Sequence, residues 1–236
     1  MNMNKVVLSG LLAGCVGAGL MSGCKSTECC AANSYNKGVK MSFYKGGEFD
    51  KKAGKQAYLD LMKKFNVPVY SRMLQEDGFL WAVDFGKGDF EALGMGGVFW
   101  TNEPEGYLGH EIYLLPFQSI AEHRHLPTKD KDGNPIQAKM ETWTVRHGYV
   151  YGFSEVGEPN LDTEFAFLKP KLSKQQYAVL KSKHVEKWTA DGYSHKLPKV
   201  ETWHFMMAGP EGAIVTETAT FHDGDGLRFT VPGIKF

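Results

Sequence analysis

Three histidines and one glutamate are the residues of this chain whose types and spacing best suit chemistry. One residue separates His123 from His125. Glu141 follows Lys139 by two positions, and His204 lies much further along the chain. Imidazole nitrogen and carboxylate oxygen are ligands that manganese, zinc, iron and nickel accept in proteins. The set therefore predicts one divalent metal ion inside a small β-barrel, with a coordination position left for a substrate.

Strand geometry explains how these side chains would converge. Residues two apart in a strand project from the same face, so His123 and His125 can reach one ion. The same rule places Lys139, Glu141 and Trp143 on one face, where a cation and an aromatic ring would flank the carboxylate. Such a row of side chains predicts a strand that lines a cavity.

His204 would complete the site from a distant strand, because the run 202–206 contains β-favouring residues. The alternative interpretation has no metal. In it, His123 and His125 are exposed on a polar hairpin, Glu141 is a solvated strand residue and His204 is a hydrogen-bonded core histidine. With 8 histidines in the chain, an isolated His-x-His pair is weak evidence by itself.

Short β-favouring runs dominate the chain from Phe79 onward, and turn residues separate them. They lie at 79–85, 95–100, 111–115, 118–125, 140–146, 150–154, 202–207, 213–221 and 227–231. Residues 50–65 predict an amphipathic helix, and the helix-prone stretch 173–188 predicts an inserted one. Many short strands with few helices predict a mainly β fold of the jelly-roll class.

The spacing of His123, His125 and Glu141 resembles the first motif of the cupin superfamily, which reads G-x5-H-x-H-x3/4-E-x6-G. Gly148 follows Glu141 after six residues, as that motif requires. Phe117 stands in place of the leading glycine, and fifteen residues separate His125 from Glu141. The extra residues are interpreted as a lengthened hairpin loop at 127–135, which is polar and rich in turn formers.

The second cupin motif supplies one further histidine, and its match here is partial. Gly192 and Pro198 have the expected spacing, whereas Val200 and Ala208 replace a glycine and an asparagine. His204 comes one residue later than in the motif. The resemblance implies a cupin-type jelly-roll β-barrel in which ligand geometry is less regular on this side.

Within the cupins, the chain resembles sugar isomerases of the D-lyxose isomerase type. It shares their Lys-x-Glu pair at 139–141 and an opening pattern of an aromatic residue, Asp, Gly-Asp-Phe and Gly, found here at 81–94. The similarity spans roughly residues 65–230. It implies a small sugar substrate near Lys139 and one divalent ion (Mn, Zn, Fe or Ni) bound by His123, His125, Glu141 and His204.

Interconversion of an aldose and a ketose moves a proton between adjacent carbons, which requires a base and stabilisation of enediolate charge. Lys139 is the candidate stabiliser. Glu217 is the candidate base, because apolar residues share its strand face and burial would raise the pKa of its carboxyl. Alternatively, Glu217 pairs with Arg228 for structure alone. Trp143 and Arg228 are the candidate substrate-binding residues, and Trp203 is a further flat surface or simply core.

Two other functions fit the same residues. A cupin dioxygenase or lyase would also hold its metal with three histidines and one glutamate, and redox chemistry would favour iron and tolerate loss of Lys139. A non-catalytic lipoprotein would instead capture a metal or a carbohydrate at the cell surface. We rank the sugar isomerase first.

The N-terminal residues resemble a bacterial lipoprotein signal. Lys5 precedes an apolar stretch at 6–20, and the four residues that end at Cys24 resemble a lipid-processing box. Cleavage of a signal peptide at 1–23 would leave Cys24 as the lipidated first residue. We therefore expect an exported protein that is lipid-anchored in the bacterial cell envelope, in the periplasm or at the cell surface. The alternative is ordinary secretion with a free thiol.

The rest of the chain divides into a flexible tether at 24–42 and a cupin domain at 43–236. Cys29 and Cys30 fall in the tether and Cys15 in the signal, so the domain cannot depend on internal disulfides. Loss of the signal changes the net charge from 0 to −1, and nothing in this balance favours nucleic acid as a partner. A homodimer is expected only because cupins often pair.

Overall fold

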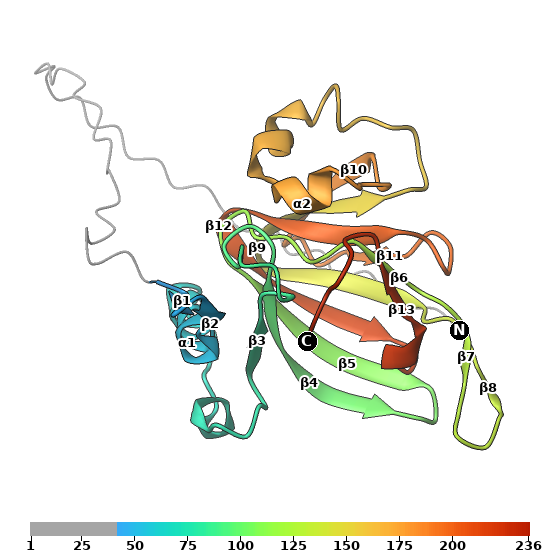
Figure 1. Cartoon of the computed structure of the whole chain (residues 1–236), viewed down its shortest axis with the longest axis horizontal. Coiled ribbons are helices and arrows are strands. Elements are labelled where there is room, and N and C mark those ends of the chain that lie inside the picture. Colours follow the sequence, from blue (N-terminus) through green and yellow to red (C-terminus); the bar gives the residue numbers. More distant parts are fainter. Residues whose placement is uncertain (1–41) are drawn as a thin grey trace, which may run out of the picture. The chain divides into compact units, whose positions relative to one another are not determined.

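The computed structural model describes residues 42–236, and Figure 1 shows how their helices and strands are arranged. The predicted signal, the predicted lipidation site Cys24 and all of the predicted tether except its last residue lie outside this range. Among the described residues, no helix is long and apolar enough to cross a lipid bilayer.

Within this range, nine strands form the main antiparallel sheet. They are β3 (Trp81–Val83), β4 (Met95–Glu103), β5 (Tyr107–Leu114), β6 (His123–His125), β9 (Glu141–Ser154), β10 (His184–Thr189), β11 (Ser194–Lys196), β12 (His204–Ala219) and β13 (Leu227–Phe229). The sheet runs in the order β10-β9-β12-β5-β4-β3, while β11 pairs with β9 and β6 pairs with both β12 and β13. Figure 1 shows the sheet curled around an interior in the manner of a jelly roll, so the predicted fold class is confirmed.

Smaller elements surround the sheet. They are β1 (Tyr44–Lys45), β2 (Glu48–Phe49), β7 (Thr128–Lys129), β8 (Pro135–Ile136), α1 (Lys51–Lys64), α2 (Lys174–Tyr177) and three 3-10 helices at Ser71–Leu74, Ala166–Lys171 and Gly224–Gly226. Strands β7 and β8 form the hairpin predicted at 127–135. Asp130 closes its turn, because its carboxylate accepts hydrogen bonds from the backbone N–H groups of Asp132 and Asn134.

The helix predicted at 50–65 is confirmed as α1. Asp50 is its N-cap, and the Asp50 carboxylate accepts hydrogen bonds from two N–H groups of the first turn that have no partner within the helix. The apolar side of α1 is buried against the sheet through Tyr58, Leu61 and Met62. Burial of this side explains why a lysine-rich segment is held as a helix.

Strand alternation gives the sheet two apolar faces. On β5, Ile112 and Leu114 belong to the core inside the curled sheet, whereas Tyr113 between them belongs to the core under α1. On β12, Val215 faces the inner core and Ile214 faces the outer one. Neighbouring residues of one strand therefore pack into different hydrophobic cores, one inside the curled sheet and one under α1.

The helix predicted at 173–188 is confirmed only over its first turn. This stretch contains only the four-residue α2 before the chain enters β10, which pairs with the edge of β9. A Cβ atom on Gly152 of β9 would lie 2.1 Å from the Trp188 ring, so the glycine leaves the space that this ring fills. Pairing and packing against β9 outweigh the local helix propensity.

Several predicted strands merge or shorten in the structure. The runs at 140–146 and 150–154 are one strand, β9, and the runs at 202–207 and 213–221 are one strand, β12. The pairing of β12 with β9 shifts in register between Ala208 and Ala213 and again between Ile214 and Val215. These irregularities let the two long strands remain paired on both sides of each shift. The predicted strand 118–125 keeps only its last three residues as β6.

Candidate metal centre

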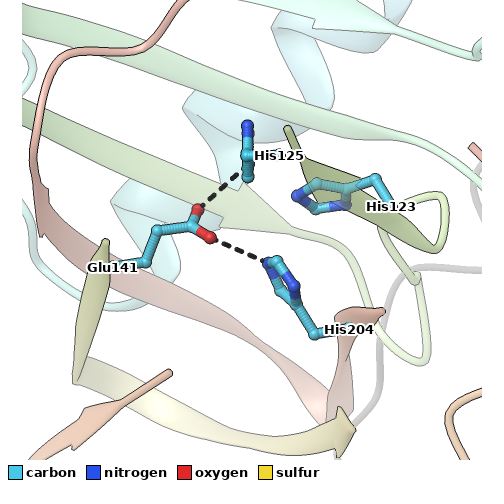
Figure 2. Close-up of side chains that lie close together, drawn as sticks. All are labelled: His123, His125, Glu141 and His204. Carbon is cyan, nitrogen blue, oxygen red and sulfur yellow. Dashed lines mark ion pairs between the residues drawn. The ribbon is translucent and has the colours of Figure 1, made fainter. Parts of the chain in front are cut away.

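The four predicted metal ligands lie together on three neighbouring strands. His123 and His125 lie on β6, Glu141 begins β9 and His204 begins β12. One ligand atom of each side chain lies within 4.8 Å of those of the other three. Figure 2 shows the four side chains directed toward one another. The convergence expected from their spacing is therefore present.

Strand pairing positions the histidines. His204 is the cross-strand partner of His123, and their ring centroids are 4.5 Å apart. His125 shares the face of His123, whereas Arg124 between them points away and its guanidinium carbon lies 4.7 Å from the Trp203 ring centroid. Lys181 Nζ lies 4.6 Å from the same ring centroid, so Trp203 packs with two cations outside the centre.

The Glu141 carboxylate lies between two histidines. Its Oε1 is 3.4 Å from His125 Nε2, and its Oε2 is 3.0 Å from His204 Nε2. Yet both nitrogens and Glu141 Oε2 are buried and lack a hydrogen-bond partner in the described part of the chain. Buried polar atoms rarely remain unsatisfied. A set of imidazole and carboxylate atoms that face one another in this way fits a divalent metal ion.

Backbone carbonyls orient two of the imidazoles. The ring of His123 contacts the Ala121 carbonyl oxygen through Nδ1 at 2.8 Å, and that of His204 contacts the Thr202 oxygen in the same way at 2.8 Å. Only a protonated Nδ1 can donate these bonds, so Nε2 carries the lone pair when the ring is neutral. Carbonyl partners of this kind commonly fix metal-binding histidines.

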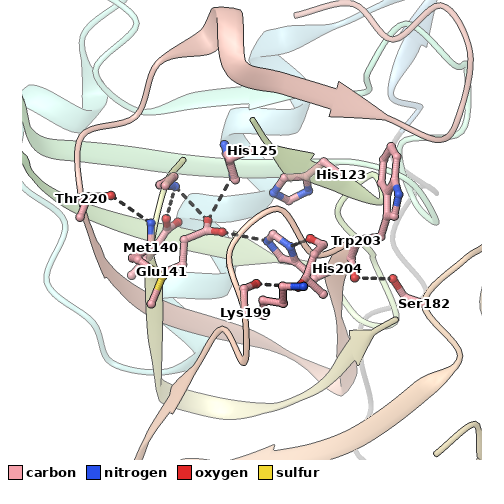
Figure 3. A network of polar contacts seen from close by, with 12 residues as sticks. His123, His125, Met140, Glu141, Ser182, Lys199, Trp203, His204 and Thr220 are labelled. Carbon is pink, nitrogen blue, oxygen red and sulfur yellow. Dashed lines mark hydrogen bonds and ion pairs between the residues drawn. The ribbon is translucent and has the colours of Figure 1, made fainter. Parts of the chain in front are cut away.

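Further hydrogen bonds hold the backbone on both sides of the cluster, as Figure 3 shows. The Ser182 hydroxyl donates to the Trp203 carbonyl at 2.9 Å, next to His204. The Met140 N–H donates to the Thr220 hydroxyl at 3.0 Å, next to Glu141. These bonds anchor the backbone next to Glu141 and His204, the first residues of β9 and β12. Both side chains would have to be held in place to bind a metal ion.

The charges of the cluster are set by burial and by its own members. Burial lowers the pKa of His123 well below its ordinary value, and the nearby His204 and His125 lower it further. Burial alone would raise the pKa of Glu141, but Lys139 and His125 bring it well below its ordinary value. For His204, burial lowers the pKa, but Glu141 raises it overall. The cluster thus pairs an ionised carboxylate with imidazoles.

Lys139 connects this cluster to Glu217. Its buried Nζ donates to Glu141 Oε1 at 3.0 Å and also contacts Glu217 Oε1. Burial lowers the pKa of Lys139, but the two carboxylates raise it overall. A charged ammonium group is therefore held between two carboxylates, one of which belongs to the metal-type cluster.

The predicted rise in the pKa of Glu217 is wrong. Burial does raise it, but Lys139 and a hydrogen bond with the His110 ring lower the pKa overall. His110 Nδ1 lies 3.1 Å from Glu217 Oε2. Glu217 is therefore held ionised by its two partners, and its ion-pair partner is Lys139, in place of the predicted alternative Arg228.

The four residues of the cluster line one cavity of about 90 Å³, together with Lys139, Trp143 and Glu217. Its other walls are mainly apolar and aromatic. Trp143 is 5.4 Å from the His204 ring and stacks on Trp188 at 5.7 Å between ring centroids. Arg228 does not line this cavity; its exposed guanidinium donates to the backbone carbonyls of Asp225 and Leu227.

His110 also lines the cavity, although sequence analysis did not single it out. Its ring is stacked against Trp81 at 5.6 Å and Phe99 at 4.3 Å. Gly97 makes room for it, because a Cβ atom there would lie 2.4 Å from His110 Nε2. The strand predicted at 111–115 begins one residue too late to include His110. A strand that began at 110 would have placed His110 on the same inner face as Ile112.

His222 is the second cavity residue that the sequence does not mark. Its ring centroid lies 5.4 Å from that of His125. Burial, with Lys139 nearby, lowers its pKa to about 4, so the ring is neutral at neutral pH. It follows β12 in an irregular segment with no periodic pattern, which is why no sequence signal pointed to it.

The jelly-roll fold and the buried cluster of three histidines and one glutamate define a cupin with a metal-type centre. No protein-family model matches the chain. A D-lyxose/D-mannose isomerase of Thermosediminibacter oceani is 32% identical over 176 residues, which cover 75% of this chain and 88% of that protein. A D-lyxose ketol-isomerase of Cohnella laeviribosi is 33% identical over 152 residues, which cover 64% and 76% of the two chains. The chain belongs to the D-lyxose isomerase family of cupin sugar isomerases.

Solved structures share the fold at low sequence identity. The L-ribose isomerase of Cellulomonas parahominis, solved with L-ribose, has a TM-score of 0.56 at 13% identity and covers 77% of this chain and 91% of its own. The L-ribose isomerase of Acinetobacter sp. DL28 in complex with L-ribose has a TM-score of 0.54 at 15% identity, with 72% and 79% covered. These likenesses concern the fold alone.

Proposed function

We propose that the protein is a metal-dependent aldose–ketose isomerase that acts on a small sugar such as D-lyxose or D-mannose. Relatives named for these sugars support the substrate class. The observation that carries the proposal is the buried Lys139–Glu217 pair directly beside the four-residue cluster. A module that only binds a metal gains nothing from a second buried carboxylate, whereas proton transfer between carbons requires a base.

The cofactor would be held by His123, His125, Glu141 and His204, whose unsatisfied buried atoms fit a divalent ion. When bound, the ion would supply a Lewis acid that acidifies the C–H bond beside the sugar carbonyl. Mixed nitrogen and oxygen donors suit manganese, iron, zinc or nickel.

Glu217 is the proposed base of the reaction. Its ionised carboxylate would accept the proton from one sugar carbon and return it to the neighbouring carbon, while the hydroxyl proton passes from one sugar oxygen to the other. Lys139 and His110 lower the pKa of Glu217, which makes it a weaker base than a free carboxylate. Stabilisation of the enediolate charge by the Lys139 ammonium would therefore have to supply a large part of the rate enhancement.

The walls of the cavity favour a small, neutral substrate. They are largely aromatic and apolar, and neutral His222 offers one nitrogen that can accept or donate a hydrogen bond. Trp143 remains the proposed flat surface for a sugar ring, while the position of Arg228 offers no support for its predicted role. Exclusion of water from these walls would strengthen the electrostatic effect of Lys139 on developing charge.

The test is solvent exchange during isomerisation. Manganese-loaded protein in deuterated water should incorporate deuterium at C2 of D-lyxose or D-mannose and form the matching ketose, as followed by NMR. Glu217→Gln keeps the side-chain shape and should lose the exchange while it keeps its metal. Absence of both ketose formation and deuterium exchange with every pentose and hexose, in protein with full metal content, would contradict the isomerase; oxygen uptake would favour a dioxygenase instead.

Attachment to the cell envelope is a separate proposal that rests on sequence alone. We propose that the protein is exported and lipidated at Cys24, because an apolar signal-like segment precedes this residue. Cells that express the full chain should incorporate labelled fatty acid into it, and Cys24→Ser should abolish this label.

A homodimer is proposed only because cupins often form dimers. Sedimentation of the purified protein tests it.

A further inference from the structure

A second cavity of about 260 Å³ lies on the outer face of the sheet, at the end of α1. We call it the outer pocket and define it by Tyr70, Trp100, Glu111, Tyr113 and Arg146, with Asn66 at its helix side. Glu111 follows His110 directly in β5. Because successive strand residues face opposite sides, the outer pocket and the metal centre lie on opposite faces of the same strand. Within the described residues, neither pocket shares a lining side chain with the other.

Tyr113 provides a buried polar group in the lining of the outer pocket. Its side chain is 0% exposed, yet its hydroxyl has no hydrogen-bond partner among the residues described. Burial raises its pKa, and Glu111 and Tyr70 raise it further, which places the hydroxyl beside these two pocket residues. A buried hydroxyl that has no partner is costly for the folded protein, so it is expected to meet a ligand atom.

Glu111 and Arg146 give the pocket one charge of each sign. Burial raises the pKa of Glu111 overall, although a hydrogen bond from Trp100 and the charge of Arg146 lower it in part. The pair leaves the pocket with no net charge to attract an anion or a cation. Instead, it offers a carboxylate that accepts hydrogen bonds and a guanidinium that donates several.

Aromatic rings form the rim. Trp100 and Tyr70 meet edge to face at 5.8 Å between ring centroids, and they are 45% and 56% exposed. His147 on the other side stacks on Phe65, and burial with Arg146 nearby lowers its pKa, so it adds no charge. Flat apolar surfaces beside paired donors and acceptors suit the C–H faces and hydroxyl groups of a polyol.

We propose that the outer pocket is a second binding site, for a neutral polyhydroxylated molecule of monosaccharide size. Vicinal hydroxyls would donate to the Glu111 carboxylate and accept from Arg146, while Tyr113 donates its free O–H to a further oxygen. The volume suits one small ring and no more, since pockets for drug-sized ligands start at about 300 Å³. The site does not depend on the proposed isomerase activity, because it uses none of the same residues.

The test uses the full chain labelled with 5-fluorotryptophan. The 19F resonance of Trp100 is assigned by its loss in Trp100→Phe. Methyl β-D-xylopyranoside and methyl α-D-mannopyranoside are the probes, because a closed glycoside ring cannot be isomerised. The Trp100 resonance should shift saturably with at least one of them, in the wild type and equally in His204→Ala, which disables the metal centre.

Variants distinguish specific binding in the outer pocket from non-specific contact of the glycoside with the exposed Trp100 ring. Tyr113→Phe and Glu111→Gln should each weaken the binding about tenfold or more, the effect of one lost hydrogen bond to a polar ligand. Tyr113→Phe removes a hydroxyl without a partner, so the variant should fold, which circular dichroism checks. The matched control is Tyr107→Phe, on the same strand but outside the pocket, and it should bind as the wild type does.

Three results would overturn the proposal. The first is an unmoved Trp100 resonance with both glycosides up to their solubility. The second is an unchanged affinity in Tyr113→Phe. The third is a shift that disappears in His204→Ala, because it would assign the glycoside to the metal centre.

Discussion

Glu217 and His110 are direct cross-strand partners in the pairing of β12 with β5, and the Glu217 carboxylate lies 3.1 Å from His110 Nδ1. The His110 ring is itself held between Trp81 and Phe99. A rigid aromatic stack therefore orients the carboxylate that we propose as the base. His110 acts on catalysis through the position of Glu217, and its replacement should show this.

His110→Phe keeps the aromatic stack but removes the hydrogen bond. We expect kcat to fall by about ten- to a hundredfold, the cost of a misplaced catalytic group. Because the His110 hydrogen bond lowers the pKa of Glu217, its loss should raise that pKa. The acidic limb of the kcat profile should then move to higher pH. Steady-state kinetics across pH measures both effects.

The matched control for this replacement is His110→Asn, whose amide can restore a donor near the position of Nδ1. It should recover part of kcat and return the acidic limb toward that of the wild type. If His110→Phe retains full kcat with an unshifted profile, the ring serves packing alone and Glu217 is oriented by Lys139.

Removal of a proposed ligand should remove the metal. In Glu141→Gln and in His204→Ala, we expect the affinity for manganese to fall by more than about a hundredfold, since even the loss of an outer hydrogen-bond partner costs 10–100-fold. Metal content after dialysis, measured by mass spectrometry, checks this. His195→Ala is the matched control, because His195 packs on Trp188 outside the cluster, and it should keep the wild-type content. Full metal in both ligand variants would contradict the assignment.

Lys139 should be important for stability as well as chemistry. In metal-free protein, Lys139→Met leaves the buried Glu141 and Glu217 without their shared cation, and we expect the free energy of unfolding to fall by about 3–5 kcal/mol at neutral pH. Lys139 lowers the pKa of both carboxyls. Its contribution is therefore present above their ordinary pKa and is lost as pH falls and they become protonated.

Urea unfolding of the metal-free protein at neutral and acidic pH measures this effect. The difference between Lys139→Met and the wild type should shrink toward acid. Lys169→Met is the control, because Lys169 forms an ion pair with Asp162 at the surface, where such pairs contribute little. Equal stability of Lys139→Met and the wild type at neutral pH would contradict the buried network.

The convergence of the metal-type cluster was predictable because strand periodicity is a local rule. His123 and His125 had to share a face wherever β6 lies. Lys139 precedes β9, which begins at Glu141, so a hydrogen bond from its Nζ to the Glu141 carboxylate, and not strand alternation, keeps it beside Glu141. The β-favouring run at 202–206 and the resemblance to cupins together indicated the distant partner, His204. The helix α1 was predictable for similar reasons, since Asp50 and the apolar stripe are both local signals.

Features set by long-range contacts were not predictable from the sequence. The segment 184–189 is a strand because β9 offers an open edge and Gly152 leaves room for Trp188, and neither fact is local. The pKa of Glu217 was predicted from burial alone. Its lowering depends on Lys139, which lies 78 positions away, and on His110 across the strand pair. Charge partners from distant strands reverse what burial alone would do.

His222 offers a final prediction about substrate binding. Its ring lines the cavity beside His125, and its buried Nδ1 has no hydrogen-bond partner in the described range. The backbone of His222 is held on both sides by the Asn102 side chain, at 2.9 and 3.0 Å. His222→Phe should therefore keep the loop in place and remove only the polar atom.

We expect this variant to raise KM by about three- to tenfold, the cost of one neutral hydrogen bond to a sugar hydroxyl, with kcat nearly unchanged. Asn102→Ala, which frees the loop, should change KM and kcat together, because every side chain on the loop then loses its position. Steady-state kinetics with the best sugar substrate separates the two patterns. A His222→Phe variant with unchanged KM would mean that the ring only fills space beside His125.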